Sequence, residues 1–356
     1  MATTSLIETW ACPREALRLQ VADRTKVVAA LVKRSPPGGF PVNAHAAQAP
    51  ISFAEEVLVV FVLTIIMGGP LGLFVWLMWA VTMGTWWHCA LWFSTFLVLA
   101  FHPLPRNCER RLAQSAFTTA LYRYFSYRIV WENDTWERGQ SIGAWIGAGP
   151  PHGVLPLANI LSISAINNFC SVWFVGAAAS VVWHTPFLRY MLLYGVVDVS
   201  GKSIAKATAE GASVGVVPDG IAGIFRTNLG KEVVLLKRRK GLAKLALRTG
   251  RPLCPAYSIG NTQAFSAAFD SWGIMESVSR RAQAALFPYW GRFGLPIPRR
   301  CNVTILLGEP IVVQQVDDPT EAQVDAVHNE LLSRMKRLFD AQKAMLGWQD
   351  KELIFE

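Results

Sequence analysis

The feature that most restricts the fold of this chain is an uncharged apolar run of 45 residues. No Asp, Glu, Lys or Arg occurs from Val57 to Phe101, and about 20 consecutive apolar residues are enough to cross a bilayer as one helix. The run therefore predicts a hairpin of two membrane helices, with its break at residues 68–70 or near residues 82–85. A single long tilted helix and an embedded re-entrant segment are the alternatives.

The basic residues after this run and the tryptophans within it are typical of a membrane segment. Arg106, Arg110 and Arg111 follow it directly, and basic residues favour the cytosolic side of a membrane. Both ends of the hairpin are therefore expected in the cytosol. Tryptophan is enriched at membrane interfaces, and the tryptophans suited to such depths are Trp76, Trp79, Trp86, Trp87 and Trp92.

The rest of the chain divides by composition and pattern. Residues 1–50 have no signal-peptide layout, and their Pro-, Gly- and Ala-rich end predicts a disordered N-terminal segment. Residues 51–105 form the expected hairpin, with one or two transmembrane helices, and residues 106–356 the expected cytosol-facing, membrane-associated domain. Strand, turn and helix patterns alternate in that domain, which predicts an α/β fold with a mixed sheet flanked by helices and sites at strand ends.

Several elements can be assigned by their residue ranges. Strands are expected at 144–148, 196–199, 213–217, 252–259 and 303–307, and a small-residue helix at 164–180. An amphipathic helix is expected at the membrane surface over 112–136, and a closing helix begins at the Asp318-Pro319-Thr320-Glu321 capping pattern. Aromatic residues over 264–290 predict another surface that touches lipid or lines an acyl channel.

Charge and cysteine usage narrow the classes of partner. The net charge is +9, and residues 226–300 hold 14 Lys/Arg against three acids, whereas acids outnumber bases ten to five from Cys301 onward. In a chain with a mean hydropathy of +0.29, such a surface favours lipid headgroups or a phosphorylated ligand over nucleic acid. The six cysteines lack metal-ligand spacing, so reduced thiols and no metal site are expected.

His152 is the strongest catalytic candidate. An apolar strand stops at Gly149-Pro150-Pro151, and proline fixes φ and donates no hydrogen bond, so the chain must turn there. His152 is then expected at a strand end facing a cavity, where an imidazole can act as a general base. The local pattern fits a buried histidine bonded to a carbonyl equally well.

A basic amphipathic helix is predicted at residues 237–250, with Gly250 as its C-cap. In an arbitrary protein such a charged face is more often a solvated surface. Behind a membrane hairpin it is also placed to hold phosphates.

These pieces, in their order, resemble the type 2 diacylglycerol acyltransferase family, which includes monoacylglycerol and wax-alcohol acyltransferases. Four motifs carry the resemblance: Pro151-His152-Gly153, Arg239-Lys240-Gly241-Leu242, the stretch from Pro255 through Gly260 and Asn261, and Gly308-Glu309-Pro310-Ile311. The resemblance extends from the apolar run to the C-terminus and includes the closing helix. It implies an acyltransferase-like fold and transfer of an acyl group from acyl-CoA to a lipid hydroxyl, at the endoplasmic reticulum membrane or a lipid droplet.

For this chemistry, His152 is the expected base, and the expected oxyanion donors are the backbone N–H groups of Gly153 and Val154 or the side chain of Asn159. The three phosphates of CoA are expected at Arg238, Arg239, Lys240 and Lys244. Acyl-CoA is a substrate, and no separate cofactor is expected. A nucleic-acid partner is not expected either, and self-association of the chain stays open.

The chain departs from the family pattern at one block. The family's Gly-Gly-x-Ala-Glu appears as Asp219-Gly220-Ile221-Ala222-Gly223, which puts an acid at the first position and removes the usual glutamate. Asp219 is therefore the hypothesised replacement that orients His152. The fifth place after His152 is Leu157 rather than the aspartate of glycerophosphate acyltransferases, which argues against lysophosphatidate acylation.

The acceptor lipid stays open at this point. Diacylglycerol, giving triacylglycerol, is the first expectation. Monoacylglycerol or a long-chain alcohol would use the same chemistry, and the departure at Gly223 leaves a non-catalytic, hairpin-anchored lipid-surface protein as the alternative of a different class.

Overall fold

A mixed β-sheet forms the centre of the protein. The computed structural model describes residues 3–105, 107–133, 135–138, 141–170, 172–226 and 231–356. Over these residues a nine-stranded sheet has the order β2-β1-β3-β12-β9-β4-β7-β5-β6. The pairs β3–β12, β9–β4, β4–β7, β7–β5 and β5–β6 are parallel, and the others are antiparallel. Its strands are β1 (Thr4–Glu8), β2 (Lys33–Arg34), β3 (Arg128–Glu132), β4 (Ile146–Ala148), β5 (Phe174–Ala178), β6 (Val196–Asp198), β7 (Ser213–Val216), β9 (Leu253–Ile259) and β12 (Thr304–Leu307).

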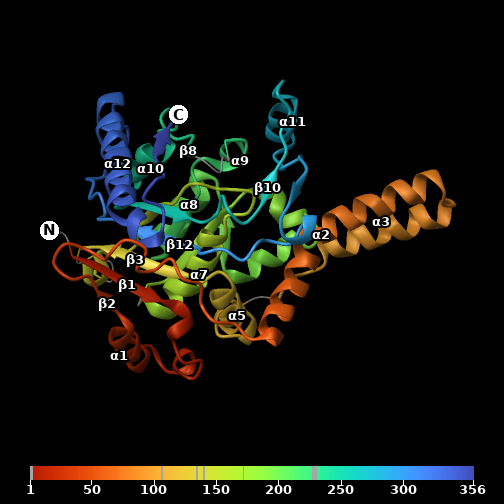
Figure 1. The fold of residues 1–356 in the computed structure, drawn as a ribbon. Helices are drawn as coiled ribbons and strands as arrows, with labels where there is room; N and C mark the ends of the chain where they lie inside the picture. The colour runs from red at the N-terminus through yellow and green to blue at the C-terminus, as the bar shows by residue number, and fades with distance from the viewer. Residues whose placement is uncertain (1–2, 106, 134, 139–140, 171, 227–230) are drawn as a thin grey trace.

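Helices cover both faces of this sheet (Figure 1). Side chains of a strand alternate between faces, so Ile129 and Trp131 join one apolar core while Val130 joins the other. The first core contains residues of α1 (Val21–Leu31), α5 (Ala116–Tyr124) and α7 (Leu157–Phe169). The second contains residues of α8 (Gly201–Ala209), α10 (Gly241–Thr249) and α12 (Glu321–Gln342). The expected mixed sheet with flanking helices is thus confirmed.

Smaller elements complete the described chain. They are α4 (Glu109–Ala113), α6 (Thr135–Arg138), α9 (Gly220–Ile224), α11 (Ile274–Ala282), β8 (Glu232–Val234), β10 (Ser266–Ala267), β11 (Tyr289–Trp290) and β13 (Leu353–Phe355), with short 3-10 helices η1 (Thr9–Ala11), η2 (Ala16–Arg18), η3 (Ser180–His184), η4 (Leu188–Tyr194), η5 (Arg292–Gly294) and η6 (Lys343–Leu346).

The expectation of a disordered N-terminal segment is wrong for the described residues. Strand β1 lies between β2 and β3 in the central sheet, and Leu6 and Ile7 are fully buried. The Pro- and Gly-rich stretch after β2 is irregular but attached, because the N–H groups of Asn43 and His45 donate to carbonyls of η6 at 2.9 Å. Composition alone missed this because an irregular backbone can still be fixed by contacts distant in sequence.

Two local assignments are also corrected. Residues 112–136 do not form one surface helix, since α5 is largely buried and β3 lies inside the sheet. The predicted helix at 164–180 is α7 followed by β5. In addition, α12 begins two residues later than the capping pattern suggested, because Thr320 rather than Asp318 is the N-cap and bonds with Gln323.

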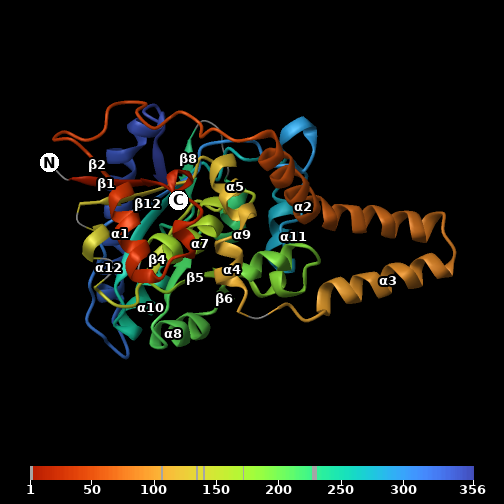
Figure 2. The same cartoon turned by 90° about the horizontal axis from the view of Figure 1, so that it is seen from below.

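The apolar run folds into two antiparallel helices that project from the body as an arm (Figures 1 and 2). Helix α2 (Phe53–Thr82) continues through Pro70, and α3 (Trp86–Phe101) follows a turn at residues 83–85. The break therefore lies at the second of the two expected positions. Among the described helices, α2 alone is long and apolar enough to cross a membrane, and α3 is shorter. Arg106, expected to fix the orientation of the hairpin, lies outside the described residues.

The first half of α2 is part of the body rather than of the arm. Val59, Leu63, Ile66 and Met67 are buried in the first apolar core. The arm begins beyond Gly69, where a side chain would overlap the ring of Phe187. Within the arm, the Nε1–H of Trp92 donates to the carbonyl of Leu73 at 2.8 Å. The predicted boundary between hairpin and domain near residue 105 consequently does not separate two structural units.

Candidate active site

The ends of three neighbouring strands meet around His152. Strands β9, β4 and β7 are adjacent and parallel, so their carboxyl ends lie at one edge of the sheet, where α/β proteins place their sites. Residues 149–152 follow β4, Asp219 follows β7, and Asn261 follows β9. The predicted strand end before His152 is confirmed.

A buried polar network fixes the loop that carries His152. The fully buried Asn261 donates through Nδ2 to the carbonyl of Pro151 at 2.8 Å and accepts from the N–H of Ala158 at 2.8 Å. Ser258 and Asn159 both donate to the carbonyl of Gly149. Buried groups without such partners would destabilise the fold by about 1–3 kcal/mol each. The network therefore holds the loop in one conformation.

Asn159 is committed to this network. Its Nδ2 donates to Gly149, and its Oδ1 accepts from Ser258 and Asn261 at 3.1 Å each. The side chain expected as one oxyanion donor thus holds the turn with one of its two Nδ2 hydrogens. Pro151, singled out only as a motif residue, supplies the carbonyl that Asn261 binds.

The hydrogen bond of the His152 ring determines which nitrogen can act as a base. The half-buried ring places Nδ1 2.8 Å from the carbonyl oxygen of Gly153. A carbonyl only accepts, so Nδ1 carries the proton and Nε2 keeps its lone pair. Among the described residues Nε2 has no hydrogen-bond partner. Both readings of the sequence thus hold in part: the ring bonds a carbonyl, and its other nitrogen stays available.

The two backbone N–H groups after His152 have the properties expected of oxyanion donors. Neither Gly153 nor Val154 donates a hydrogen bond through its N–H to another residue in the described part of the chain. Gly153 has a φ of +61°, and a Cβ there would lie 2.5 Å from the carbonyl oxygen of Asn261. Only glycine permits this close approach.

Asp219 contacts the backbone of His152, not its ring. The carboxylate is completely buried, and Oδ2 accepts from the His152 N–H at 3.0 Å. Burial raises the pKa of Asp219 above its usual value, while the protonated form of His152 and the charge of Arg239 act in the opposite direction. The hypothesis that Asp219 orients the ring directly is therefore replaced by a contact that fixes the loop.

The glycine at position 223 makes room for this carboxylate. A Cβ on Gly223 would lie 2.2 Å from Oδ2 of Asp219, which is shorter than any real contact of that kind. An acid at 219 and a side chain at 223 consequently exclude each other in this backbone. The two departures from the family block are coupled in space.

A second buried acid lies behind the site, and sequence reasoning missed it. Glu232 accepts from the hydroxyls of Tyr257 at 2.9 Å and Thr262 at 3.1 Å. Burial raises its pKa to about 7, and both hydroxyl bonds partly offset that effect. The available signal was a pair of polar residues, Tyr257 and Ser258, inside an otherwise apolar strand.

The basic motif borders an open groove. The groove has a volume of about 870 Å³ and is lined by Leu235, Lys237, Arg238, Lys240, Phe355 and Glu356. Of the four predicted phosphate ligands, Arg238 and Lys240 are in this lining. Arg239 instead donates to the carbonyl of Pro218 at 3.1 Å, next to Asp219. Lys244 is exposed on α10, away from the lining.

The motif glycines have distinct local roles. Gly220 has a φ of +50° after Asp219, and Gly260 a φ of +97° between β9 and Asn261, with the carbonyl of Asn302 too close for a side chain. Gly241 is exposed and begins α10, with open space around it. Lys240 forms an ion pair with Asp325 of α12.

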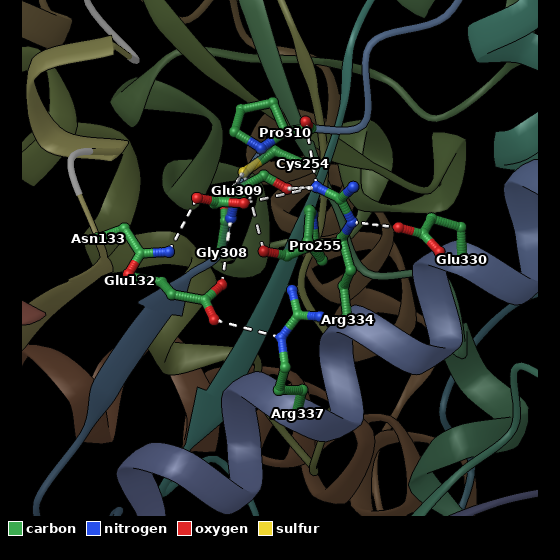
Figure 3. Close-up of polar contacts among 10 residues, drawn as sticks. All are labelled: Glu132, Asn133, Cys254, Pro255, Gly308, Glu309, Pro310, Glu330, Arg334 and Arg337. Carbon is green, nitrogen blue, oxygen red and sulfur yellow. Dashed lines mark hydrogen bonds and ion pairs between the residues drawn. The ribbon is translucent and has the colours of Figure 1, made fainter. Parts of the chain in front are cut away.

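The Gly308-Glu309-Pro310 motif lies at the other edge of the sheet (Figure 3). Strand β12 runs antiparallel to β9, so its end is near the start of β9. Glu309 accepts from Asn133 at 2.8 Å, and its carbonyl accepts from Arg334 of α12 at 3.2 Å. Arg337 pairs with Glu132 at 3.5 Å. This motif holds α12 on the sheet and takes no part in the arrangement around His152.

Comparisons with known proteins show the family of this chain. A family model described as diacylglycerol acyltransferase matches residues 80–356. The protein belongs to the diacylglycerol acyltransferase family. It is accordingly an acyltransferase enzyme, and the resemblance read from its motifs is confirmed.

The relatives of this acyltransferase are moderately similar. Diacylglycerol O-acyltransferase 2 of Homo sapiens is 27% identical over 75% of this chain and 74% of its own length. 2-acylglycerol O-acyltransferase 1 of Bos taurus is 29% identical over 66% of this chain and 76% of its own length. Among solved structures, the 1-acyl-sn-glycerophosphate (LPA) acyltransferase PlsC of Thermotoga maritima is 14% identical, with a TM-score of 0.40 over 81% of this chain and 98% of that one. That score is too low for the two folds to be taken as the same.

The exclusion between Asp219 and Gly223 predicts an exchange experiment in this acyltransferase. Gly223→Ala should lower acyl transfer as much as Asp219→Ala does, because both leave the His152 N–H without its acceptor. The double variant Asp219→Gly with Gly223→Glu should recover part of the activity. Gly201→Ala, where a Cβ meets only ordinary contact with Leu245 at 3.8 Å, serves as the control. Full activity in Gly223→Ala or Asp219→Ala would contradict this role.

The raised pKa of Glu232 predicts a pH-dependent stability. Between about pH 4.5 and 7 the folded protein keeps a proton on Glu232 that the unfolded chain loses, so stability falls as pH rises. The shift corresponds to about 3 kcal/mol. The thermal unfolding temperature in detergent should fall less across this pH range for Glu232→Gln than for the wild type. Glu352→Gln, an exposed carboxylate, should match the wild type, and parallel profiles for all three proteins would refute the assignment.

Proposed function

We propose that this protein esterifies diacylglycerol to triacylglycerol with acyl-CoA as the donor. The observation that carries the proposal is the availability of Nε2 of His152 at the edge where three strands end. The acceptor hydroxyl gives its proton to Nε2 while its oxygen attacks the thioester carbonyl. Collapse of the tetrahedral intermediate breaks the C–S bond, and the imidazolium returns the proton to the leaving CoA thiolate.

The negative charge of that intermediate needs hydrogen-bond donors. The N–H groups of Gly153 and Val154 make no other hydrogen bond within the described residues, and they precede the N-terminus of α7, whose dipole favours negative charge. Donors fixed before the reaction need no reorganisation during it. Asp219 supports this step indirectly, because its bond to the His152 N–H holds the same loop.

The groove at the basic motif suits the CoA portion of the donor. Arg238 and Lys240 line it, and Arg239, between them in the sequence, donates to the carbonyl of Pro218. Guanidinium and ammonium groups bind phosphate oxygens. CoA bound there would lie next to the loop that carries His152.

The acceptor is diacylglycerol in the first instance, by similarity to the diacylglycerol O-acyltransferase 2 relatives. Monoacylglycerol is the second candidate, because a 2-acylglycerol O-acyltransferase is similar over two thirds of this chain. Either hydroxyl would undergo the same attack at His152.

The arm is the proposed membrane anchor. Its exposed surface is apolar, with Leu71, Phe74, Val81 and Trp86 all more than half exposed, a pattern unfavourable in water. The start of α2 and the end of α3 both dock on the body, so the arm enters and leaves the lipid from one side. We assign that side to the cytosolic face of the endoplasmic reticulum or a lipid droplet. Lipid photocrosslinking from Val81 in the arm tests the anchor.

Removing the base tests the proposed reaction. His152→Ala and His152→Gln should reduce triacylglycerol synthesis by about 10²- to 10⁴-fold with unchanged thermal unfolding. The measurement is thin-layer analysis of neutral lipids formed from labelled acyl-CoA in membranes without other acyltransferases. Equal background product from wild type and variants would favour the non-catalytic alternative. Wax ester or diacylglycerol as the sole product would instead overturn the assigned acceptor.

Neutralising the groove tests the CoA site. Arg238→Gln should raise the KM for acyl-CoA about five-fold, corresponding to ~1 kcal/mol for an exposed charge pair, with little change in kcat. Arg248→Gln, on the same basic segment but outside the groove lining, is the matched control. Equal shifts of the KM for acyl-CoA in both variants would show that the site is wrong. So would a ratio of KM values for acyl-CoA and its 3′-dephospho analogue that is the same in Arg238→Gln as in the wild type.

A further inference from the structure

We infer that the protein has a second contact with the lipid surface, formed by residues 266–297. This segment, the α11 excursion, comprises β10, α11, β11 and η5. It carries a group of highly exposed apolar side chains that neither the arm nor the catalytic site uses: Trp272 (83%), Phe293 (77%), Ile274 (59%), Leu295 (50%), Leu286 (49%) and Val278 (47%). The proposed occupant is a phospholipid surface, and the inference does not rest on the proposed reaction.

Helix α11 turns its apolar face away from the protein. Asp270 accepts from the first N–H groups of the helix, those of Ile274 at 2.7 Å and Met275 at 2.9 Å. Ile274 and Val278, four residues apart, share the exposed face, while Ser279 is buried on the other face. A helix of a soluble surface has the reverse arrangement. Outward apolar residues on a helix of this kind are typical of interfacial membrane binding.

The excursion is fastened to the root of the arm. Tyr289 donates to the carbonyl of Met67 in α2 at 2.9 Å, and Arg292 pairs with Glu56 at the start of the same helix. Pro296 lies against Gly68, just before the arm leaves the body. In both views α11 lies on the side of the body from which the arm projects (Figures 1 and 2). The exposed Phe293 and Leu295 thus belong to a segment that contacts the root of the arm.

The charge of the excursion selects the kind of surface. Arg280 and Arg281 are exposed in the last turn of α11, beside the apolar face. Arg280 lies 3.7 Å from Glu276, which also pairs with Arg226. Arg281 has no ion pair within the described residues. Basic residues next to interfacial apolar side chains favour anionic headgroups.

The test uses the full-length protein in vesicles of phosphatidylcholine and phosphatidylserine. A benzophenone amino acid is placed in turn at Ile274 and Phe293, at Val81 in the arm, and at Val312. Val312 is 78% exposed, but its neighbour Val313 packs with α10 and α12, on the side away from the arm (Figure 1). Lipid adducts should form at Ile274 and Phe293 several-fold more than at Val312, and adducts at Ile274 should decrease when phosphatidylserine is omitted.

The possible outcomes separate this inference from the anchor. Lipid adducts at Val81 with only Val312-level adducts at Ile274 and Phe293 would overturn the second contact and leave the arm as anchor. Protein–protein adducts at Ile274 would show that another chain covers the face, which also overturns it. Arg280→Glu with Arg281→Glu should abolish the phosphatidylserine dependence at Ile274, and unchanged dependence would remove the role given to these charges.

Discussion

The position of His152 depends on a loop that is hydrogen-bonded from both sides by neighbouring strand ends. Asn261 after β9 binds the carbonyl of Pro151, and Asp219 after β7 binds the N–H of His152. Both side chains are fully buried, so breaking either bond would leave a polar group without a partner in the interior. The loop therefore has one favourable conformation. That conformation directs Nδ1 to the carbonyl of Gly153 and leaves Nε2 for chemistry.

The position of Asp219 depends on the absence of a side chain at residue 223 as well as on its charge. Oδ2 of Asp219 occupies the space that a side chain on residue 223 would need. The absence of the glutamate at position 223 and the presence of the aspartate at position 219 therefore depend on each other. A buried carboxylate is unfavourable unless it is hydrogen-bonded, and the His152 N–H supplies that bond. The departure that leaves a non-catalytic protein as the alternative is thus compatible with a structured site. The two elements proposed to contact lipid, the arm and the α11 excursion, lie on one side of the same body.

The sequence predicted those features that depend on local backbone chemistry. Proline after a short strand placed His152 at a strand end, and the uncharged run predicted paired apolar helices. Contacts between distant segments could not be predicted. Asn261 reaches Pro151 across 110 residues, Glu232 meets Tyr257 only when β8 and β9 are folded, and β1 enters the sheet although its surroundings are rich in Pro and Gly. Asn159 was assigned to the oxyanion because its type fits, whereas its partners in the fold hold the turn.

Nitrogen NMR of histidine-labelled protein tests the central claim most directly. The ring signals of His152, identified by their loss in His152→Gln, report which nitrogen carries the proton at neutral pH. The account predicts a proton on Nδ1 and a free lone pair on Nε2, with Asp219→Ala changing these signals because the loop is released. A proton on Nε2 and a deprotonated Nδ1 in the wild-type protein would contradict the account.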